Sequence, residues 1–158
     1  MYKRQDLYFA SNRPGGYGGS DIYVSHYAKG KWSKPQNLGP NINTNKNETC
    51  PFIHADDQTL YFTSDGWQGY GDTDLFYSQK MYPDEWSKPI NLGYPINTLD
   101  HEGALFVAAN GVNAYFASNR TDSRGGLDIY SFTLRKDIRP TKTTWVKGVV
   151  YDLSLIHI

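Results

Sequence analysis

Leu60-Tyr61-Phe62-Thr63-Ser64 decides the fold of this chain, because the chain repeats it. The pattern stands 53 residues earlier as Leu7-Tyr8-Phe9-Ala10-Ser11 and 54 residues later as Ala114-Tyr115-Phe116-Ala117-Ser118. Ten residues after the serine of each copy comes a second motif, Asp-(Ile or Leu)-(Tyr or Phe). Self-similarity at a fixed period of this length indicates a repeat architecture.

The second repeat is complete and predicts four short strands. They are expected at residues 50–55, 60–64, 74–80 and 86–92. Segments rich in Asp, Gly and Pro separate them and are typical of turns. The second of these strands is apolar at nearly every position, as expected where both faces of a sheet are covered. Lys88 and Pro89 mark the fourth as an edge strand, because proline cannot donate a hydrogen bond to a neighbouring strand.

The third repeat supports the same unit. Its apolar run at residues 105–108 is followed by Asn110-Gly111, a strong signal for a two-residue hairpin turn. A four-stranded antiparallel unit with a polar edge and this period is typical of a β-propeller blade. The sequence therefore predicts an all-β fold, a partial β-propeller over residues 1–138 with about two and a half to three blades. The repeats are expected near residues 6–47, 48–101 and 102–138.

Two further motifs recur and carry a family resemblance. The motif Trp-Ser-Lys-Pro-x-Asn-Leu-Gly begins at Trp32 and again at Trp86, where x is Gln36 in the first copy and Ile90 in the second. The tripeptide Ile-Asn-Thr follows each copy. The Tyr-Phe-x-Ser, glycine-rich loop and Asp-(Ile or Leu)-(Tyr or Phe) pattern resembles the WD-repeat-like β-propeller repeats of the TolB type. With the tryptophan and Ile-Asn-Thr motifs it is similar to the propellers of OmpA-family envelope proteins of Bacteroidetes-type bacteria, some of which serve type IX secretion and gliding. The resemblance covers about residues 6–136.

That resemblance implies a location and a domain order. It implies a periplasmic, outer-membrane-associated protein with envelope proteins as partners, and peptidoglycan binding through a domain outside this chain. Residues 139–144 are expected to be a linker, and 145–152 resemble the opening strand of a carboxypeptidase-regulatory-like β-sandwich. Residues 153–158 have no counterpart in the repeats and are expected to be a non-native tail. Open strand edges at both ends predict that the piece associates when it is alone.

Composition argues against several classes of partner. Sixteen basic and sixteen acidic residues cancel, so no basic field attracts nucleic acid. No apolar stretch is long enough to span a bilayer as a helix. The single cysteine, Cys50, permits no intrachain disulfide. The histidines fall at different positions in their repeats, so we expect no metal and no cofactor.

Three sets of side chains recur once per repeat, and we interpret them as structural. An aspartate at the start of the third strand is expected to accept N–H groups from the preceding loop. A carboxylate ring for a metal or for acid–base work is the alternative, but catalysis needs different groups converging on one point. The tryptophans are expected to be buried against a neighbouring blade, with stacking on sugars as the alternative. The sets are Ser11, Ser64 and Ser118; Asp21, Asp74 and Asp128; and Trp32 and Trp86.

Two groups of residues are candidates for binding. A polar ring at the mouth of a propeller channel would contain Asn43, Glu48, Asn97 and Glu102, with a hydrogen-bonded clasp between blades as the alternative. A partner-binding face would contain the aromatic and arginine residues of the glycine-rich loops, because such residues anchor protein interfaces. This second group is Arg13, Tyr17, Trp67, Tyr70, Arg120 and Arg124.

The function predicted from these features is a non-enzymatic binding scaffold of the cell envelope, since no catalytic constellation is visible. One alternative is the propeller of a hydrolase, either a glycosidase or a prolyl-oligopeptidase-type peptidase. A peptidase of that kind would need a Gly-x-Ser-x-Gly domain, which this sequence does not contain. The other alternative is a glycan or small-ligand sensor at the channel mouth.

Overall fold

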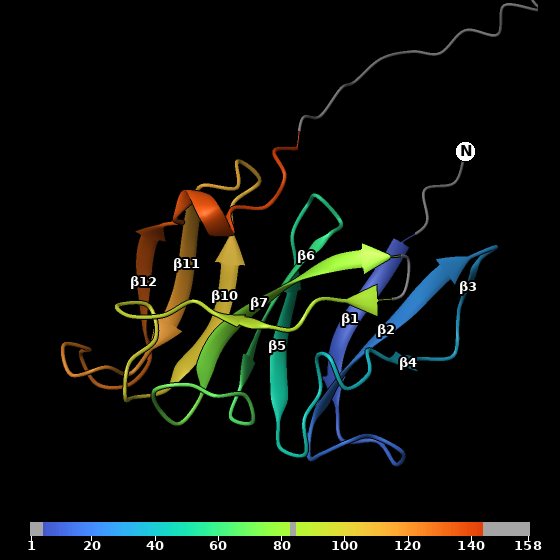
Figure 1. The fold of residues 1–158 in the computed structure, drawn as a ribbon, viewed down its shortest axis with the longest axis horizontal. Coiled ribbons are helices and arrows are strands. Elements are labelled where there is room, and N and C mark those ends of the chain that lie inside the picture. The colour runs from blue at the N-terminus through green and yellow to red at the C-terminus, as the bar shows by residue number, and fades with distance from the viewer. Residues whose placement is uncertain (1–4, 83–84, 144–158) are drawn as a thin grey trace, which may run out of the picture.

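The computed structural model describes residues 5–82 and 85–143, which form three antiparallel sheets in chain order (Figure 1). The N-terminal sheet contains β1 (Gln5–Ser11), β2 (Asp21–Ala28), β3 (Lys31–Trp32) and β4 (Gln36–Asn37). The central sheet contains β5 (Glu48–Ile53), β6 (Thr59–Ser64), β7 (Asp74–Tyr82), β8 (Glu85–Trp86) and β9 (Ile90–Asn91). The C-terminal sheet contains β10 (Glu102–Val107), β11 (Asn113–Ser118) and β12 (Asp128–Thr133), and a short 3-10 helix, η1 (Lys136–Ile138), follows. The predicted all-β class is confirmed.

The fourth strand of the repeat differs from its prediction. In place of one strand over residues 86–92, the central sheet has two short pieces, β8 and β9, which both pair with β7. Ser87 interrupts the ladder: its N–H donates to Gln79 O (2.8 Å), and its hydroxyl accepts from Gln79 N (3.0 Å). Pro89 follows without an N–H to continue the pairing. The edge therefore stays irregular and short.

The first strand of the repeat also starts earlier than predicted. β5 begins at Glu48, which lies opposite Ser64, and its register with β6 shifts between Thr49 and Phe52. Cys50 sits at this irregularity with a φ of 50°. The turn before β11 is longer than the two residues predicted from Asn110-Gly111, because it takes residues 108–112.

The sheets stack through β6, which supplies both of its faces to the core. Leu60 and Phe62 pack toward the N-terminal sheet, and Tyr61 packs toward the C-terminal sheet. All six residues of β6 are buried, which confirms that an unbroken apolar strand is covered on both sides. Full burial of one such side chain contributes about 1.5–3 kcal/mol. The repeat motif in β6 therefore contributes side chains to both interfaces of the central sheet, one with the N-terminal sheet and one with the C-terminal sheet.

The two recurring tryptophans lie in different environments. Trp86 is buried and meets Tyr8 of the N-terminal sheet edge-on, with ring centroids 6.1 Å apart. Trp32 is 50% exposed and contacts only the ring of Tyr27 among the aromatic pairs of the described residues. The expected burial is therefore right for Trp86 and wrong for Trp32, because none of the described residues packs a sheet against the outer side of β3.

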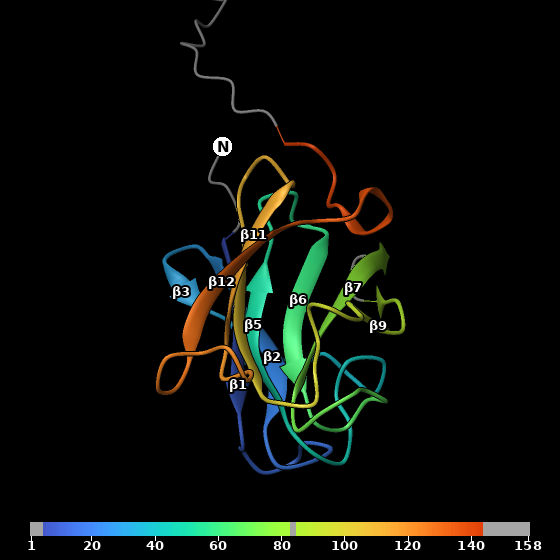
Figure 2. The ribbon, with the colours of Figure 1, turned by 90° about the vertical axis from the view of Figure 1, so that its left-hand side faces the viewer.

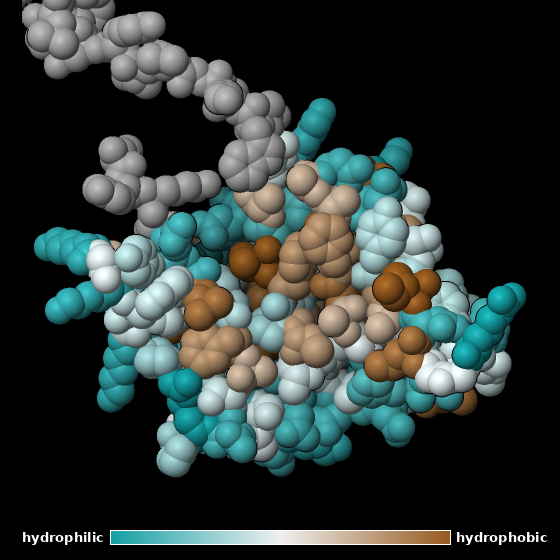
Figure 3. Space-filling view, turned by 180° about the vertical axis from the view of Figure 1, so that it is seen from behind, coloured by the Kyte–Doolittle hydropathy of each residue, from teal (hydrophilic) through white to brown (hydrophobic). Residues whose placement is uncertain are grey.

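Apolar side chains also reach the surface. Seen from behind, they gather in the middle of the molecule, while hydrophilic side chains project around the rim (Figure 3).

Figure 2 shows the C-terminal sheet from its outer side, with β11 and β12 in front and no other strand covering them. The sheet stack therefore ends in an open face.

Residues 139–143, part of the expected linker, make two hydrogen bonds to the preceding structure. Arg139 Nε donates to Leu134 O (2.9 Å), and Thr141 N donates to the Asp56 carboxylate of the central sheet (2.9 Å). The segments expected to open a β-sandwich (145–152) and to be a non-native tail (153–158) lie outside the described residues.

Candidate binding site

The Ile-Asn-Thr segments link one sheet to the next, and their asparagines act as clamps. Asn43 accepts from Ile22 N (2.7 Å) and donates to Ile22 O (3.0 Å). Asn97 bonds in the same way to Leu75 N and O, both at 2.8 Å. Each side-chain amide thus takes the place of a strand neighbour for one residue of β2 or β7. Both amides are buried.

The threonine of the same segment binds the glutamate that opens the next sheet. Glu48 accepts from Thr44 N (2.8 Å), Thr44 Oγ1 (2.7 Å) and Ser64 Oγ (2.7 Å). Burial raises the pKa of Glu48, although the hydrogen bonds from Thr44 and Ser64 oppose the shift. Glu102 repeats this pattern, accepting from Thr98 Oγ1 (2.7 Å) and from a serine hydroxyl of β11.

These contacts correct the prediction of a polar ring at a channel mouth. Asn43, Glu48, Asn97 and Glu102 are all buried, with at most 2% of each residue exposed. Their polar atoms are used in hydrogen bonds within and between sheets, because a buried polar group needs a partner. The alternative interpretation, a hydrogen-bonded clasp, describes what these residues do in the structure.

The recurring serines and aspartates hold the glycine-rich loops. Asp21 accepts from Tyr17 N (2.5 Å), Asp74 from Tyr70 N (2.6 Å) and Asp128 from Arg124 N (2.6 Å), as the structural interpretation predicts. Burial raises the pKa of Asp74, against the backbone bonds that it accepts. The serine hydroxyls accept in each loop from a group two residues onward: Ser11 from Arg13 Nε, Ser64 from Gly66 N and Ser118 from Arg120 N.

Two residues expected on the partner-binding face instead donate hydrogen bonds to the linker that precedes their sheet or repeat. Trp67 is half-buried, and its Nε1 donates to Ile42 O (2.8 Å). Arg120 donates to the corresponding carbonyl of the next linker, Ile96 O (2.6 Å), and to Pro95 O (2.9 Å). Loop position alone predicted exposure, but each side chain turns back onto the preceding linker. Neither is free for a partner in the way the sequence suggested.

Of the other four residues of the predicted face, one packs against aromatic rings and three are exposed. Arg13 is half-buried, with its guanidinium carbon 5.0 Å from the ring centre of Phe9 and 4.8 Å from that of Tyr23. Tyr17, Tyr70 and Arg124 are exposed. These three lie in three different loops.

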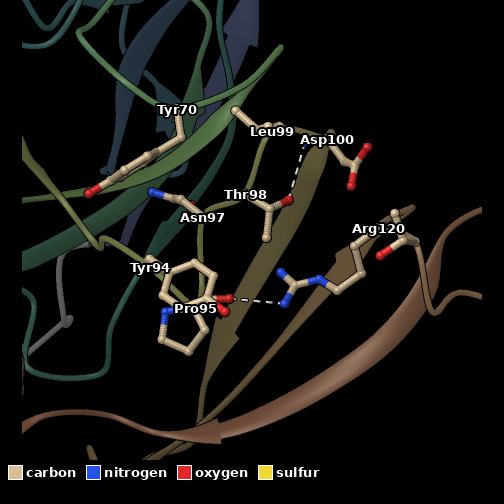
Figure 4. Close-up of a pocket in the computed structure, with 9 residues that line it drawn as sticks. Tyr70, Tyr94, Pro95, Asn97, Thr98, Leu99, Asp100 and Arg120 are labelled. Atoms are coloured by element: carbon tan, nitrogen blue, oxygen red, sulfur yellow. Dashed lines mark hydrogen bonds between the residues drawn. The ribbon is translucent and has the colours of Figure 1, made fainter.

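A pocket opens at the junction between the central and C-terminal sheets. It has a volume of about 380 Å³ and is lined by Tyr70, Tyr94, Pro95, Leu99, Arg120 and Thr121, among others (Figure 4). Three of these side chains leave much of their apolar surface in solvent: Tyr70 is 54% exposed, Tyr94 75% and Leu99 80%. Arg120 lies along one wall with its guanidinium directed at the Pro95 carbonyl (Figure 4).

The repeat explains why a pocket exists at this junction. Thr121 occupies the loop position that Trp67 occupies in the preceding repeat, three residues after the serine. At the first junction the indole of Trp67 packs against the core between the sheets. At the second junction the short side chain of Thr121 lines open space, and Arg120 supplies the hydrogen bond to the linker.

Sequence reasoning found part of this pocket and missed part. Tyr70 and Arg120 were expected to be functional, whereas Tyr94 and Leu99 were not. The sequence signal that could have found them is a difference between the two linkers. Tyr94 and Leu99 stand at the positions that Pro40 and Asn45 occupy in the first linker, so the second linker has large apolar side chains there.

The described residues also bear on metal binding and on membrane-spanning helices. His54 is buried, with Nε2 3.2 Å from Ala108 O and Nδ1 accepting from Asp56 N (3.2 Å). Within residues 5–82 and 85–143, no three His, Cys, Asp or Glu side chains are grouped to hold a metal ion. None of the helical segments described there has the length and apolar character to cross a membrane.

Comparison with known proteins does not assign this chain to a family. No protein-family model matches this chain, and no curated protein matches it.

Proposed function

We propose that this chain is part of a β-propeller scaffold that binds a protein partner, and that the pocket beside Tyr94 receives an apolar side chain of that partner. The propeller is supported by three stacked sheets with the same strand order and the same clasp at both junctions. By resemblance, we place the scaffold in the bacterial periplasm near the outer membrane. Its partners would be envelope proteins, such as type IX secretion or gliding components.

The observation that carries the binding proposal is the exposure of Tyr70, Tyr94 and Leu99 around one hollow. Large apolar side chains gathered at the surface are typical of protein interfaces, and tyrosine is enriched at the residues that contribute most to binding. A small anionic ligand fits less well, because Arg120 already donates to two backbone carbonyls. An apolar side chain in the pocket needs no donor from Arg120.

The test is a photo-crosslinking amino acid placed at Tyr94 in the full-length protein, in the cells that produce it. A discrete adduct to one protein is expected. The matched control is the same substitution at Tyr82, which is 69% exposed and does not line the pocket. Equal adducts at both positions, or none at Tyr94, would refute the proposal.

A second variant tests the pocket itself. Thr121→Trp introduces an indole at the position that Trp67 occupies in the preceding repeat, so the fold has a precedent for it. Filling the pocket should reduce the Tyr94 adduct at least about tenfold, equivalent to roughly 1.4 kcal/mol of binding free energy. An unchanged adduct, with the thermal midpoint of the variant also unchanged, would show that the partner does not use the pocket.

A further inference from the structure

The two internal junctions define which positions meet when one sheet stacks on the next. At the first junction, Leu60 and Phe62 of the central sheet face Tyr8 and Ile22 of the N-terminal sheet. At the second, Ala114 and Phe116 of the C-terminal sheet face Tyr61 and Leu75 of the central sheet. Each sheet therefore has a rear face, which meets the preceding sheet, and a front face, which meets the following one.

The rear face of the N-terminal sheet has the same apolar pattern but no sheet against it among the described residues. Leu7, Phe9 and Trp32 occupy the positions of Leu60, Phe62 and Trp86. The latter three are at most 4% exposed, whereas Leu7 is 49% and Trp32 50% exposed. The sequence thus supplies a stacking face at this end, and the structure leaves it open.

The front face of the C-terminal sheet is the counterpart. Phe106, Tyr115 and Ile129 occupy the positions of Phe52, Tyr61 and Leu75, which contact the next sheet at the second junction. Their exposed fractions are 53%, 43% and 81%. Figure 2 shows this face toward the viewer, across β11 and β12. The positions named on the two faces are uncharged, and the guanidinium of Arg13 lies over the ring of Phe9 on the rear face.

We propose that the rear face of the N-terminal sheet docks on the front face of the C-terminal sheet of a second copy of this chain. The contact would continue the internal stacking from one copy to the next, because one chain carries both halves of the junction. Such a contact is heterologous, joining two different faces, and it closes into a ring when the rotation allows. Two copies of the three described sheets would place six sheets in such a ring, within the range of about 4–8 blades in closed propellers. The residues involved are distinct from those of the pocket at Tyr94.

The molar mass of the full chain in solution tests this inference. Light scattering during size-exclusion chromatography should give the mass of two copies, shifting toward one copy on dilution. Trp32→Asp and Ile129→Asp should each give a single copy, because either substitution places a charge on one half of the contact. Ile90→Asp is the matched control, since Ile90 is 50% exposed but belongs to the central sheet, and it should keep the wild-type mass.

Mixing the two face variants separates a heterologous contact from other modes of association. The Trp32→Asp chain keeps an intact front face, and the Ile129→Asp chain keeps an intact rear face. An equimolar mixture should therefore regain a species with the mass of two copies. A single-copy mass for the wild type at every concentration would overturn the inference. So would a two-copy mass for either variant alone, which is expected if rear faces pair with each other or if open strand edges associate.

Discussion

At the scale of single residues, Asp56 ties a turn of the central sheet to the chain that follows the last sheet. Its carboxylate accepts from the N–H groups of Gln58, Thr59 and Thr141 and from the Thr59 hydroxyl. Burial acts to raise its pKa, but these hydrogen bonds together outweigh burial and hold the pKa below the usual 3.8. The ionised form therefore stabilises the fold above pH 3.8, and this stabilisation is lost as pH falls through the lowered pKa.

Asp56→Asn should lower the free energy of unfolding by about 1–2 kcal/mol at neutral pH, since an amide accepts fewer and weaker bonds. The difference from wild type should shrink as the pH falls below 3.8. Urea unfolding over a pH series measures both effects. Asp57→Asn, at the exposed neighbouring position, should change little. A loss that stays constant into acid would show that the charge of Asp56 has no part in it.

Gly66 shows that a close approach can fix one residue of a loop. A Cβ added there would lie 1.9 Å from Thr44 Oγ1, the hydroxyl that donates to Glu48. Gly66→Ala should therefore cost about 1–3 kcal/mol of unfolding free energy, because the clasp must move to admit the methyl group. Gly103→Ala is the control, since its Cβ would meet its nearest neighbour, Ala117 Cβ, at an ordinary 3.4 Å. Equal thermal midpoints for the two variants would contradict this account.

At the scale of elements, the asparagine clamp substitutes for a missing strand neighbour. Asn97→Ala would leave the buried N–H of Leu75 without its acceptor, while Leu75 O would still accept from Leu92 N (3.1 Å). One such unsatisfied donor should cost about 1–3 kcal/mol. Hydrogen exchange of the Leu75 amide should accelerate more than exchange elsewhere in β7. Asn45→Ala, at an exposed position of the other linker, serves as the control. Retained protection at Leu75 would mean that the strand does not depend on the clamp.

The elements also show where the sequence sufficed and where it did not. β6 and β7 were predictable because their residues face covered surfaces on both sides and recur in each repeat. The broken fourth strand was not, since the Ser87 bonds to Gln79 depend on how the chain returns across β7. The burial of Glu48 was equally hidden, because its partner Ser64 lies on the adjacent strand. A repeated polar residue looks the same in sequence whether it lines a channel or closes a clasp.

Trp67 and Arg120 illustrate the same limit for the candidate site. Both stand in glycine-rich loops, where exposure is the ordinary expectation. Their acceptors, Ile42 O and Ile96 O, lie 25 and 24 residues away along the chain. The pocket depends on a difference between repeats, and a pattern sought for its regularity does not draw attention to Tyr94 or Leu99.

At the scale of the whole molecule, stability should depend on stacking between sheets, and the paired tryptophans measure it. Trp86 and Trp32 hold the same position in their repeats, but only Trp86 lies between two sheets. Trp86→Ala should therefore cost about 3–5 kcal/mol, as for a large side chain removed from a core. Trp32→Ala should cost less than about 1 kcal/mol, because half of that residue already contacts solvent.

The comparison is best made in a chain that also carries Ile129→Asp, so that docking between copies does not bury Trp32. Urea unfolding of the two alanine variants then reports the stacking contribution of one indole at one repeat position. Equal losses would mean that the junction does not depend on Trp86. If Trp32→Ala becomes costly only when residue 129 is isoleucine, the extra cost measures the contact between copies, because the two residues lie on opposite open faces of the stack.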